Sequence, residues 1–175
     1  MNKEENAAED FEVVDHGNGD VELLSYLGSS EVVVIPEEWN GKKITTISSF
    51  VFANSSPVKA IKLSSSIVNI MKGAFAMNKS LEIVVCGSGL KTIEEGAFQE
   101  CSALHTVVLN DGLTKIGGIA FGGCKNLLKL EIPVSVVELQ PMAFYNSSED
   151  FVLVGKAGSV AETYAKDNGI TFEAN

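Results

Sequence analysis

Hydrophobic positions recur along the chain with a period of 23 residues. The period is clearest for phenylalanine, which stands at five positions spaced by that interval: Phe52, Phe75, Phe98, Phe121 and Phe144. Chance would place four further phenylalanines on one such interval in about one of 10^5 trials. An aliphatic residue also stands five positions before each of them: Ile47, Ile70, Ile93, Ile116 and Leu139. Repeats of this length are typical of solenoids, in which equivalent segments stack as successive coils.

Each period contains the pattern of a short strand followed by a bend. Apolar residues stand nine and, in four of the five coils, eleven positions after the phenylalanines: Ile61, Val84, Val107, Leu130 and Leu153, then Leu63, Cys86, Leu109 and Ile132. Because alternate residues of a strand point to one face, these positions predict a short strand with one buried face. Two further apolar columns, three residues apart, predict a turn or a second short strand. A small residue, usually alanine, precedes each phenylalanine and predicts a tight bend there.

A single 23-residue segment cannot bury these residues, but stacked segments can, because each apolar column then runs along the whole stack. We predict one domain of the β-rich α/β class, folded as a right-handed leucine-rich-repeat solenoid of about five 23-residue coils. The solenoid is expected over residues 31–155. An acidic tail and a capping hairpin are expected over residues 1–30, and a C-terminal cap of one short helix and one strand over residues 156–175.

The two ends have the patterns of capping elements, which cover the apolar faces of the terminal coils. Apolar runs at residues 11–14 and 21–24 flank a segment rich in Gly and Asn, and this arrangement predicts a hairpin. Near the C-terminus, Ser159 and Glu162 have the spacing of a capping box at the start of a helix. Gly169 predicts the helix end, and residues 170–172 predict a last strand beside residues 152–154.

The repeat resembles the BspA-like leucine-rich repeats. Their order of spaced aliphatic residues, then Ala-Phe and a small residue, matches best over residues 104–124 and 127–144. The opening is similar to a first repeat of that family, through residues 26–30, 34–36 and 40–41. The resemblance covers roughly residues 20 to 173. It implies a cell-surface or secreted, adhesin-like protein that attaches to host matrix proteins or to other cells.

The charge of the chain excludes some classes of partner. The sequence has 13 basic residues, all of them lysine, against 23 acidic residues, for a net charge of −10. Its field repels nucleic acid and anionic lipid, and without arginine it lacks the planar group that reads phosphates and base edges. We therefore expect no nucleic-acid binding. No apolar run reaches the roughly 20 residues of a transmembrane segment, and the acidic first residues are unlike a signal peptide.

Two of the three cysteines, Cys101 and Cys124, occupy the same column one coil apart, while Cys86 replaces an aliphatic residue of a predicted strand. Stacked neighbours in one column can lie near disulfide distance, or they can be small buried side chains with free thiols. The other members of the column are also small, which favours free thiols: Ser55, Asn78 and Ser147. No cysteine or histidine pair has the spacing of a zinc site, so we expect no metal.

The sequence contains no pattern typical of a catalytic site. His16 lies in the predicted hairpin turn, and His105 lies in a column of mixed chemistry, so we interpret both as structural. The chain lacks a nucleophile elbow, a phosphate-binding loop, a dinucleotide fingerprint and a zinc-protease motif. We therefore predict that the protein is not an enzyme and needs no cofactor.

The outward side of the main strands is the candidate partner-binding face. Its residues lie eight and ten positions after the phenylalanines of three successive coils: Ile83, Val85, Thr106, Val108, Lys129 and Glu131. The first four would form an apolar patch on an open sheet, and exposed patches of this kind mark partner contacts. Alternatively, another part of the protein covers them, as in buried parallel sheets. Trp39, in an enlarged first loop, is either a second contact or a buried support of the first coil.

We predict a non-catalytic repeat module that binds a protein or a glycan through this face. The expected partner is a host matrix protein, another cell-surface protein or a glycan, with weak self-association through the same patch. We expect a cell-surface or secreted location if an export signal has been removed. Otherwise we expect a cytoplasmic protein, and the alternative function is then that of an intracellular scaffold.

Overall fold

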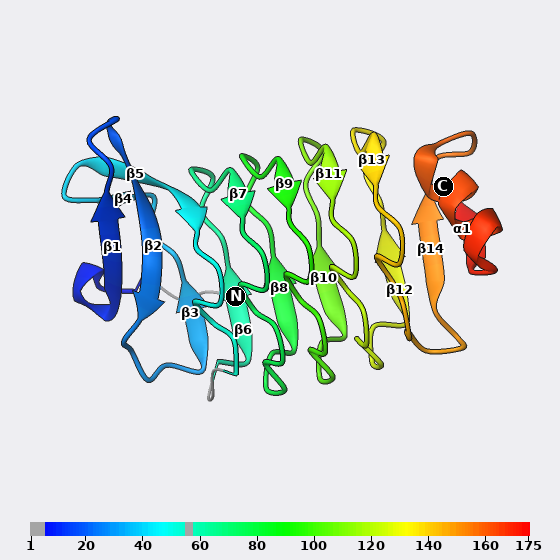
Figure 1. Cartoon of the computed structure of the whole chain (residues 1–175), viewed down its shortest axis with the longest axis horizontal. Helices are drawn as coiled ribbons and strands as arrows, with labels where there is room; N and C mark the ends of the chain where they lie inside the picture. Colours follow the sequence, from blue (N-terminus) through cyan, green and yellow to red (C-terminus); the bar gives the residue numbers. More distant parts are fainter. Residues whose placement is uncertain (1–5, 55–57) are drawn as a thin grey trace.

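The computed structural model describes residues 6–54 and 58–175, and in it the chain forms an elongated stack of coils (Figure 1). Each coil passes through two strands on opposite sides of the stack. The strands on the first side are β3 (Val32–Val34), β6 (Ala60–Lys62), β8 (Ile83–Val85), β10 (Thr106–Val108), β12 (Lys129–Glu131) and β14 (Val152–Gly155). Those on the second side are β5 (Lys42–Ile47), β7 (Asn69–Ile70), β9 (Thr92–Ile93), β11 (Lys115–Ile116) and β13 (Glu138–Leu139). The predicted strands and the solenoid are confirmed.

The predicted number of about five coils is slightly low, because the solenoid has about 7 turns of ~23 residues. A count of phenylalanines stops at Phe144. It therefore misses β14, after which the helix α1 (Val160–Asn168) takes the place of another Ala-Phe bend. The last strand, β15 (Thr171–Ala174), then lies parallel to β14, with Val152 opposite Thr171.

The first side of the stack consists of two sheets. One contains four parallel strands in the order β10-β8-β6-β3, and the other contains β12, β14 and β15. β10 and β12 belong to successive coils, yet no pairing of these two strands joins the sheets. The second side is continuous, in the order β1-β2-β5-β7-β9-β11-β13, where β1 is Phe11–Asp15 and β2 is Asp20–Tyr26. The short strand β4 (Glu38–Trp39) also pairs with β5.

The five repeated phenylalanines form one stacked column through the core. Successive ring centroids lie 5.0, 4.8, 5.1 and 5.8 Å apart, with interplanar angles of 2° to 10°. Further aromatic rings extend the column at both ends. The ring centroid of Tyr26 lies 5.7 Å from that of Phe52, and the ring centroid of Phe151 lies 5.1 Å from that of Phe144. The 23-residue spacing of the phenylalanines therefore corresponds to one continuous column of rings in the core.

The bend around each phenylalanine has a left-handed residue on either side. The residue two positions before each phenylalanine and the residue two positions after it have positive φ angles: Phe50, Gly73, Gly96, Ile119 and Met142, then Asn54, Met77, Glu100, Gly123 and Asn146. The chain turns tightly between them, and the phenylalanine N–H donates to the alanine carbonyl of the next coil, at 2.8 Å for Phe98 and Ala120. In the four later bends, the residue before the phenylalanine is a fully buried alanine, and a larger side chain there would separate the stacked bends.

The column three positions after each phenylalanine joins neighbouring bends by hydrogen bonds. The side chains of Asn78, Cys101 and Cys124 each donate to the phenylalanine carbonyl of the preceding coil, at 3.2, 3.1 and 3.2 Å. Ser55, the first member of this column, lies outside the described residues. The cysteines are free, and burial raises the pKa of the Cys124 thiol to about 12. These thiols therefore serve as small buried donors.

The N-terminal end of the stack is covered by a hairpin of β1 (Phe11–Asp15) and β2 (Asp20–Tyr26), after a 3₁₀ turn at Ala8–Asp10. β2 pairs in parallel with β5 of the first coil. Asn6 reaches the other side of the stack, where its N–H donates to the Val34 carbonyl and its Oδ1 accepts from the Val34 N–H, at 3.1 and 2.9 Å. Residues 1–5 of the predicted acidic tail lie outside the described residues, and domain boundaries near residues 30 and 155 stay a prediction.

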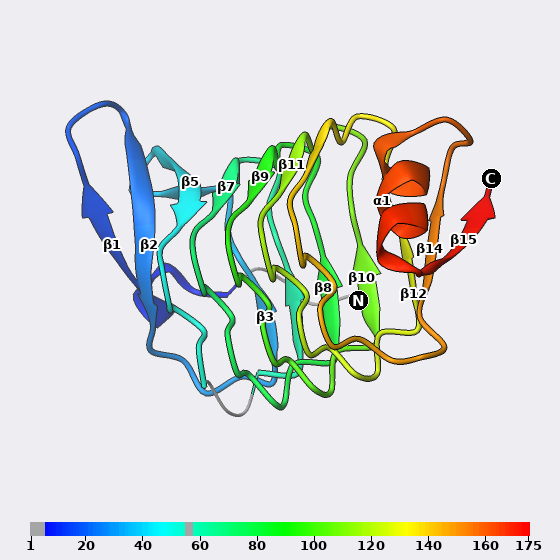
Figure 2. The same ribbon diagram turned by 45° about the vertical axis from the view of Figure 1, so that its right-hand side comes forward.

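The helix α1 covers the other end of the stack, opposite the hairpin (Figure 2). It ends at Gly169, whose φ of 65° is left-handed, as predicted. The predicted capping box is only partly present. Ser159 is the N-cap residue but makes no side-chain cap bond, and the Glu162 carboxylate accepts from the Gly158 N–H at 2.6 Å. The reason is that the Ser159 N–H already donates to the Lys156 carbonyl, so the carboxylate bonds the neighbouring N–H.

Tyr164 of α1 completes the last bend. In the preceding coils, the phenylalanine N–H donates to the alanine carbonyl of the next bend, but no further Ala-Phe bend follows Phe144. Burial raises the pKa of the Tyr164 hydroxyl, and hydrogen bonds from the Phe144 and Ala143 backbones oppose that rise. The Tyr164 hydroxyl thus lies near these backbone groups at the end of the stack, and its ring packs edge-on to that of Phe144, with 5.7 Å between the two centroids.

Candidate binding surface

The structure brings four of the candidate residues together on β8 and β10, which are neighbouring strands (Figure 1). Ile83 lies opposite Thr106, and Val85 lies opposite Val108. Ile83, Val85 and Thr106 are half-buried, while Val108 is 49% exposed. We call these four residues the valine patch. It is an apolar area on the open face of a sheet.

Two other outward positions are buried in the structure. Ala60 and Val154, which the period also places on the outward face, are each only 6% exposed. Ala60 is small and lies between Val32 and Ile83, and Val154 lies between two glutamates, Glu131 and Glu173. Longer neighbouring side chains therefore cover both residues from solvent, and the accessible apolar area is smaller than the periodic pattern indicates.

The two charged candidate residues lie on the other sheet and have partners there. Lys129 of β12 makes an ion pair with Glu173 of β15 at 2.8 Å, and Glu131 accepts from the Asn175 side chain at 2.5 Å. Both pairs are exposed, so their contribution to stability is small. Lys129 and Glu131 therefore flank the valine patch across the boundary between the sheets and do not continue it.

A notch of about 250 Å³ lies at that boundary, between the ends of β10 and β12. It is lined by six residues: Val107, Val108, Leu109, Asp111, Glu131 and Pro133. The sequence prediction missed this notch. The available signal was the second residue after each strand, which is Gly87 after β8, Asn110 after β10 and Pro133 after β12. A Cβ at Gly87 would lie 2.0 Å from the Ser64 carbonyl oxygen, so only a glycine allows coils to approach that closely there.

A second cavity, of about 310 Å³, lies between the last bend and the C-terminal cap. Phe144, Tyr145, Phe151 and Tyr164 contribute aromatic surface to it, and the loop at residues 146–149 contributes polar groups. It lies beside Phe144, where α1 follows in place of a further Ala-Phe bend. We interpret it as a consequence of the cap.

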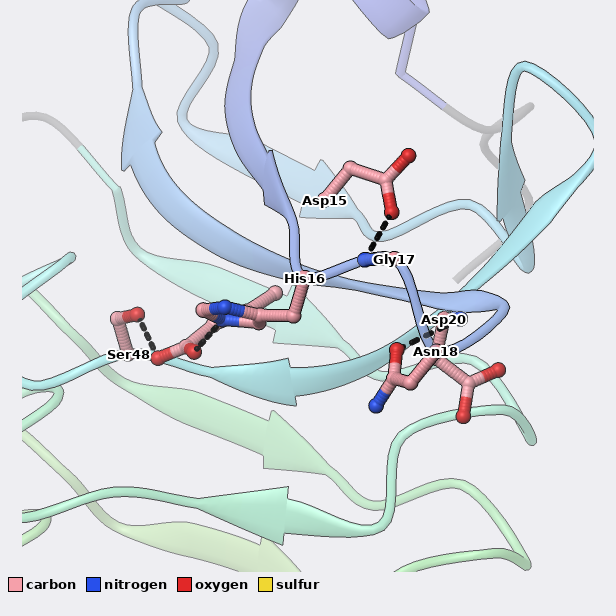
Figure 3. Close-up of polar contacts among 7 residues, drawn as sticks. Asp15, His16, Gly17, Asn18, Asp20 and Ser48 are labelled. Carbon is pink, nitrogen blue, oxygen red and sulfur yellow. Dashed lines mark hydrogen bonds and ion pairs between the residues drawn. The ribbon is translucent and has the colours of Figure 1, made fainter.

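The two histidines lie in different parts of the structure, His105 beside the valine patch and His16 in the N-terminal hairpin. His105 is exposed, and its Nδ1 lies 2.9 Å from the hydroxyl oxygen of the next residue, Thr106. His16 belongs to the hairpin, where its Nε2 lies 3.0 Å from the Glu22 carboxylate, which also accepts from the Ser48 hydroxyl (Figure 3). The carboxylate therefore stands between the hydroxyl and the imidazole, whereas a nucleophilic serine needs the imidazole beside it.

Asp15 and Asn18 fix the hairpin turn beside this cluster (Figure 3). The Asp15 carboxylate accepts from the Gly17 N–H at 2.9 Å, and the Asn18 side chain accepts from the Asp20 N–H at 3.2 Å. A hydrogen bond from Lys42 and the bond from Gly17 hold the pKa of Asp15 below its ordinary value. These contacts set the shape of the cap.

Other candidate features have structural positions. Trp39 is half-buried and packs against the core, as expected of a support for the first coil. In the part of the chain that the structure describes, no group of histidine, cysteine, aspartate and glutamate side chains could hold a metal ion. Within the same residues, no helix has the length and apolar character needed to cross a membrane.

The comparisons with known proteins agree with the fold. A family model described as "BspA type Leucine rich repeat region" matches residues 29–149 in 6 copies. A search of curated proteins found no match. Among solved structures, a leucine-rich repeat protein from T. pallidum has a TM-score of 0.82 and 25% identity, with 86% of this chain and 71% of that chain covered.

Two further solved structures are similar. A leucine-rich repeat protein from Bacteroides ovatus has a TM-score of 0.72 and 26% identity, over 83% of this chain and 39% of that chain. A leucine-rich cell surface protein from Faecalibacterium prausnitzii has a TM-score of 0.62 and 15% identity, over 99% of this chain and 55% of that chain. At that identity, the third likeness shows the fold alone.

Proposed function

The chain belongs to the BspA-type leucine-rich repeat family, and from this premise we propose that it is a non-catalytic module that binds another protein through the valine patch. The observation that carries the proposal is the exposure of apolar side chains on an open strand face, above all of Val108 at 49%. Apolar groups grouped on one face leave water when a partner covers them, and this transfer contributes about 25 cal/mol per Å².

The chemistry of the face favours a protein partner over a glycan. Sugar rings are commonly held by stacking on aromatic side chains. The outward columns of the strands contain no aromatic residue: Ala60, Ile83, Thr106, Lys129 and Val152, then Lys62, Val85, Val108, Glu131 and Val154. Aliphatic side chains beside charged ones instead match the apolar centre and polar rim of a protein interface.

The proposed location is the cell surface or the medium, and the proposed partner is a host matrix protein or another cell-surface protein. The resemblance to a family of bacterial surface-type proteins supports this location. Fractionation of the source cells, with detection by an antibody, tests it. Recovery with the cytoplasmic proteins would instead favour the scaffold function.

The binding proposal is tested by reversing the character of the patch. In the variant Val85→Lys with Val108→Glu, both side chains still point to solvent, so we expect a folded protein that no longer captures its partner. The matched control is Val134→Lys with Val137→Glu, because these valines are 65% and 77% exposed and lie outside the patch. Captures from a panel of matrix and surface proteins are compared among the three proteins.

The outcomes separate the alternatives. Loss of capture in the patch variant alone supports the proposal, and equal capture by all three proteins refutes it. A second copy of the chain is the competing occupant of the patch. In that case, light scattering would show a dimer of the unmodified protein that the patch variant lacks.

A further inference from the structure

The notch between β10 and β12 marks a missing rung of backbone hydrogen bonds. In the other coils, the N–H of the residue after each main strand donates to the carbonyl of the third residue of the next main strand. Ile35, Leu63, Cys86 and Ile132 make this bond at 2.8 to 3.0 Å. Leu109 is the equivalent residue of the fourth coil, and in the described chain its N–H has no such bond to Glu131. The notch therefore contains an unused backbone donor.

The missing rung also exposes residues that belong to the core. Val107 occupies an inward column whose other members, Ile61, Val84, Leu130 and Leu153, are at most 1% exposed. Val107 is half-buried, and so is Leu109 beside it. Both line the notch, so its floor consists of apolar groups that a continuous sheet would cover.

The charged groups of the notch all have one sign. Asp111 and Glu131 are its two charged lining residues, and both are exposed at its rim. One Glu131 oxygen, Oε1, accepts from Asn175, which leaves Oε2 for another donor. The nearby cation on β12, Lys129, is paired with Glu173. An apolar floor, two carboxylates at the rim and a backbone donor complement a basic side chain of an extended peptide.

We propose that the notch receives a lysine or arginine side chain from the protein that covers the valine patch. The aliphatic part of that side chain packs on Val107 and Leu109, and its charged end lies between Asp111 and Glu131. The Leu109 N–H donates to a carbonyl oxygen of the same peptide. This inference rests on the proposed function, since Val108 belongs to both the patch and the notch.

The test uses a labelled peptide, acetyl-Gly-Val-Arg-Val-Gly-amide, and its citrulline analogue, which keeps the shape and loses the charge. Binding is followed by the amide NMR signals of the full chain. We expect the arginine peptide to shift the signals of Val107 and Leu109. Citrulline should weaken binding about tenfold or more, as should the variant Asp111→Asn with Glu131→Gln. The control variant Glu149→Gln with Asp167→Asn removes the same charge elsewhere and should bind as the unmodified protein does.

Three results would overturn the inference: no shift at Val107 and Leu109 with millimolar peptide, equal binding of the citrulline peptide, or equal weakening by the control variant. The last of these would show that only the overall negative charge attracts the peptide. The proposed function has a separate outcome. If the Asp111→Asn, Glu131→Gln protein still captures the partner that the valine-patch variant loses, the patch binds the partner and the notch does not contribute.

Discussion

Replacing the phenylalanine at the middle of the aromatic column measures how much the stacked core contributes to stability. Phe98 is fully buried, and its ring centroid lies 4.8 Å from that of Phe75 and 5.1 Å from that of Phe121. Phe98→Ala removes the ring and both stacked contacts, and rigid neighbouring coils cannot close the cavity. We expect the free energy of unfolding to fall by about 3–5 kcal/mol, towards the upper end of the usual range.

The assay is urea unfolding followed by far-UV circular dichroism at a fixed pH. Phe50→Ala is the matched control, because this ring is 59% exposed and its loss should cost less than about 1 kcal/mol. Phe144→Ala should lie between the two, since Phe144 has a stacked repeat neighbour, Phe121, on only one side. If Phe98→Ala lowers the free energy of unfolding by no more than Phe50→Ala does, the stacked column does not stabilise the fold as argued.

Pairs of substitutions test whether the coils support one another. Phe75 and Phe98 are in contact, so the cost of replacing both should differ from the sum of the single costs by about 0.5 kcal/mol or more. Phe52 and Phe121 belong to coils that are not adjacent, and their costs should add. Equal additivity of the two pairs would show that neighbouring rings contribute independently.

Three further substitutions test other parts of the structure. Tyr164→Phe should lower the free energy of unfolding by about 1–2 kcal/mol, because the Phe144 N–H loses its acceptor, whereas the exposed Tyr145→Phe should change nothing measurable by thermal unfolding. Gly87→Ala should lower the free energy of unfolding, measured in urea, by about 3 kcal/mol or more, because its Cβ would lie 2.0 Å from the Ser64 carbonyl oxygen. Gly158→Ala should lower it by only about 1 kcal/mol, because the space around Gly158 is open and only its positive φ is unfavourable for alanine. Burial raises the pKa of the Cys86 and Cys124 thiols from 9.0 to about 12, so the unfolded chain loses these protons at a lower pH than the folded chain does. The free energy of unfolding should therefore fall as the pH rises from 9 towards 12, and this fall should be less steep in Cys124→Ala.

The core could be predicted from the sequence because stacking forces equivalent residues to repeat. Each phenylalanine contacts the phenylalanine of the next coil, so a change in one coil is felt in its neighbours, and the interval of 23 residues persists from Phe52 to Phe144. The hairpin, the helix end at Gly169 and the strand at β15 follow from local turn and capping chemistry. The coil count was slightly low because Tyr164 replaces an Ala-Phe bend with a different chemistry.

The surface could be predicted only in part, because outward positions have no such constraint. Alternation correctly pairs Val85 with Val108 across two strands, but it says nothing about the neighbours that bury Ala60 and Val154. It also assumes a continuous sheet. The break between β10 and β12 depends on how closely two coils approach, and that distance is set by backbone contacts that no residue pattern states directly.

A departure in an inward column carries more information about function than a departure in an outward one. Outward residues such as Lys62 and Glu131 differ between coils at little cost, because each is solvated in any case. Val107 is different, since its position is buried in the coils on either side. Its partial exposure forgoes part of the roughly 1.5–3 kcal/mol that burial of a valine contributes. A partner that covers Val107 recovers this free energy only on binding. Binding of a partner at the notch would therefore complete the burial of this inward column of the solenoid core.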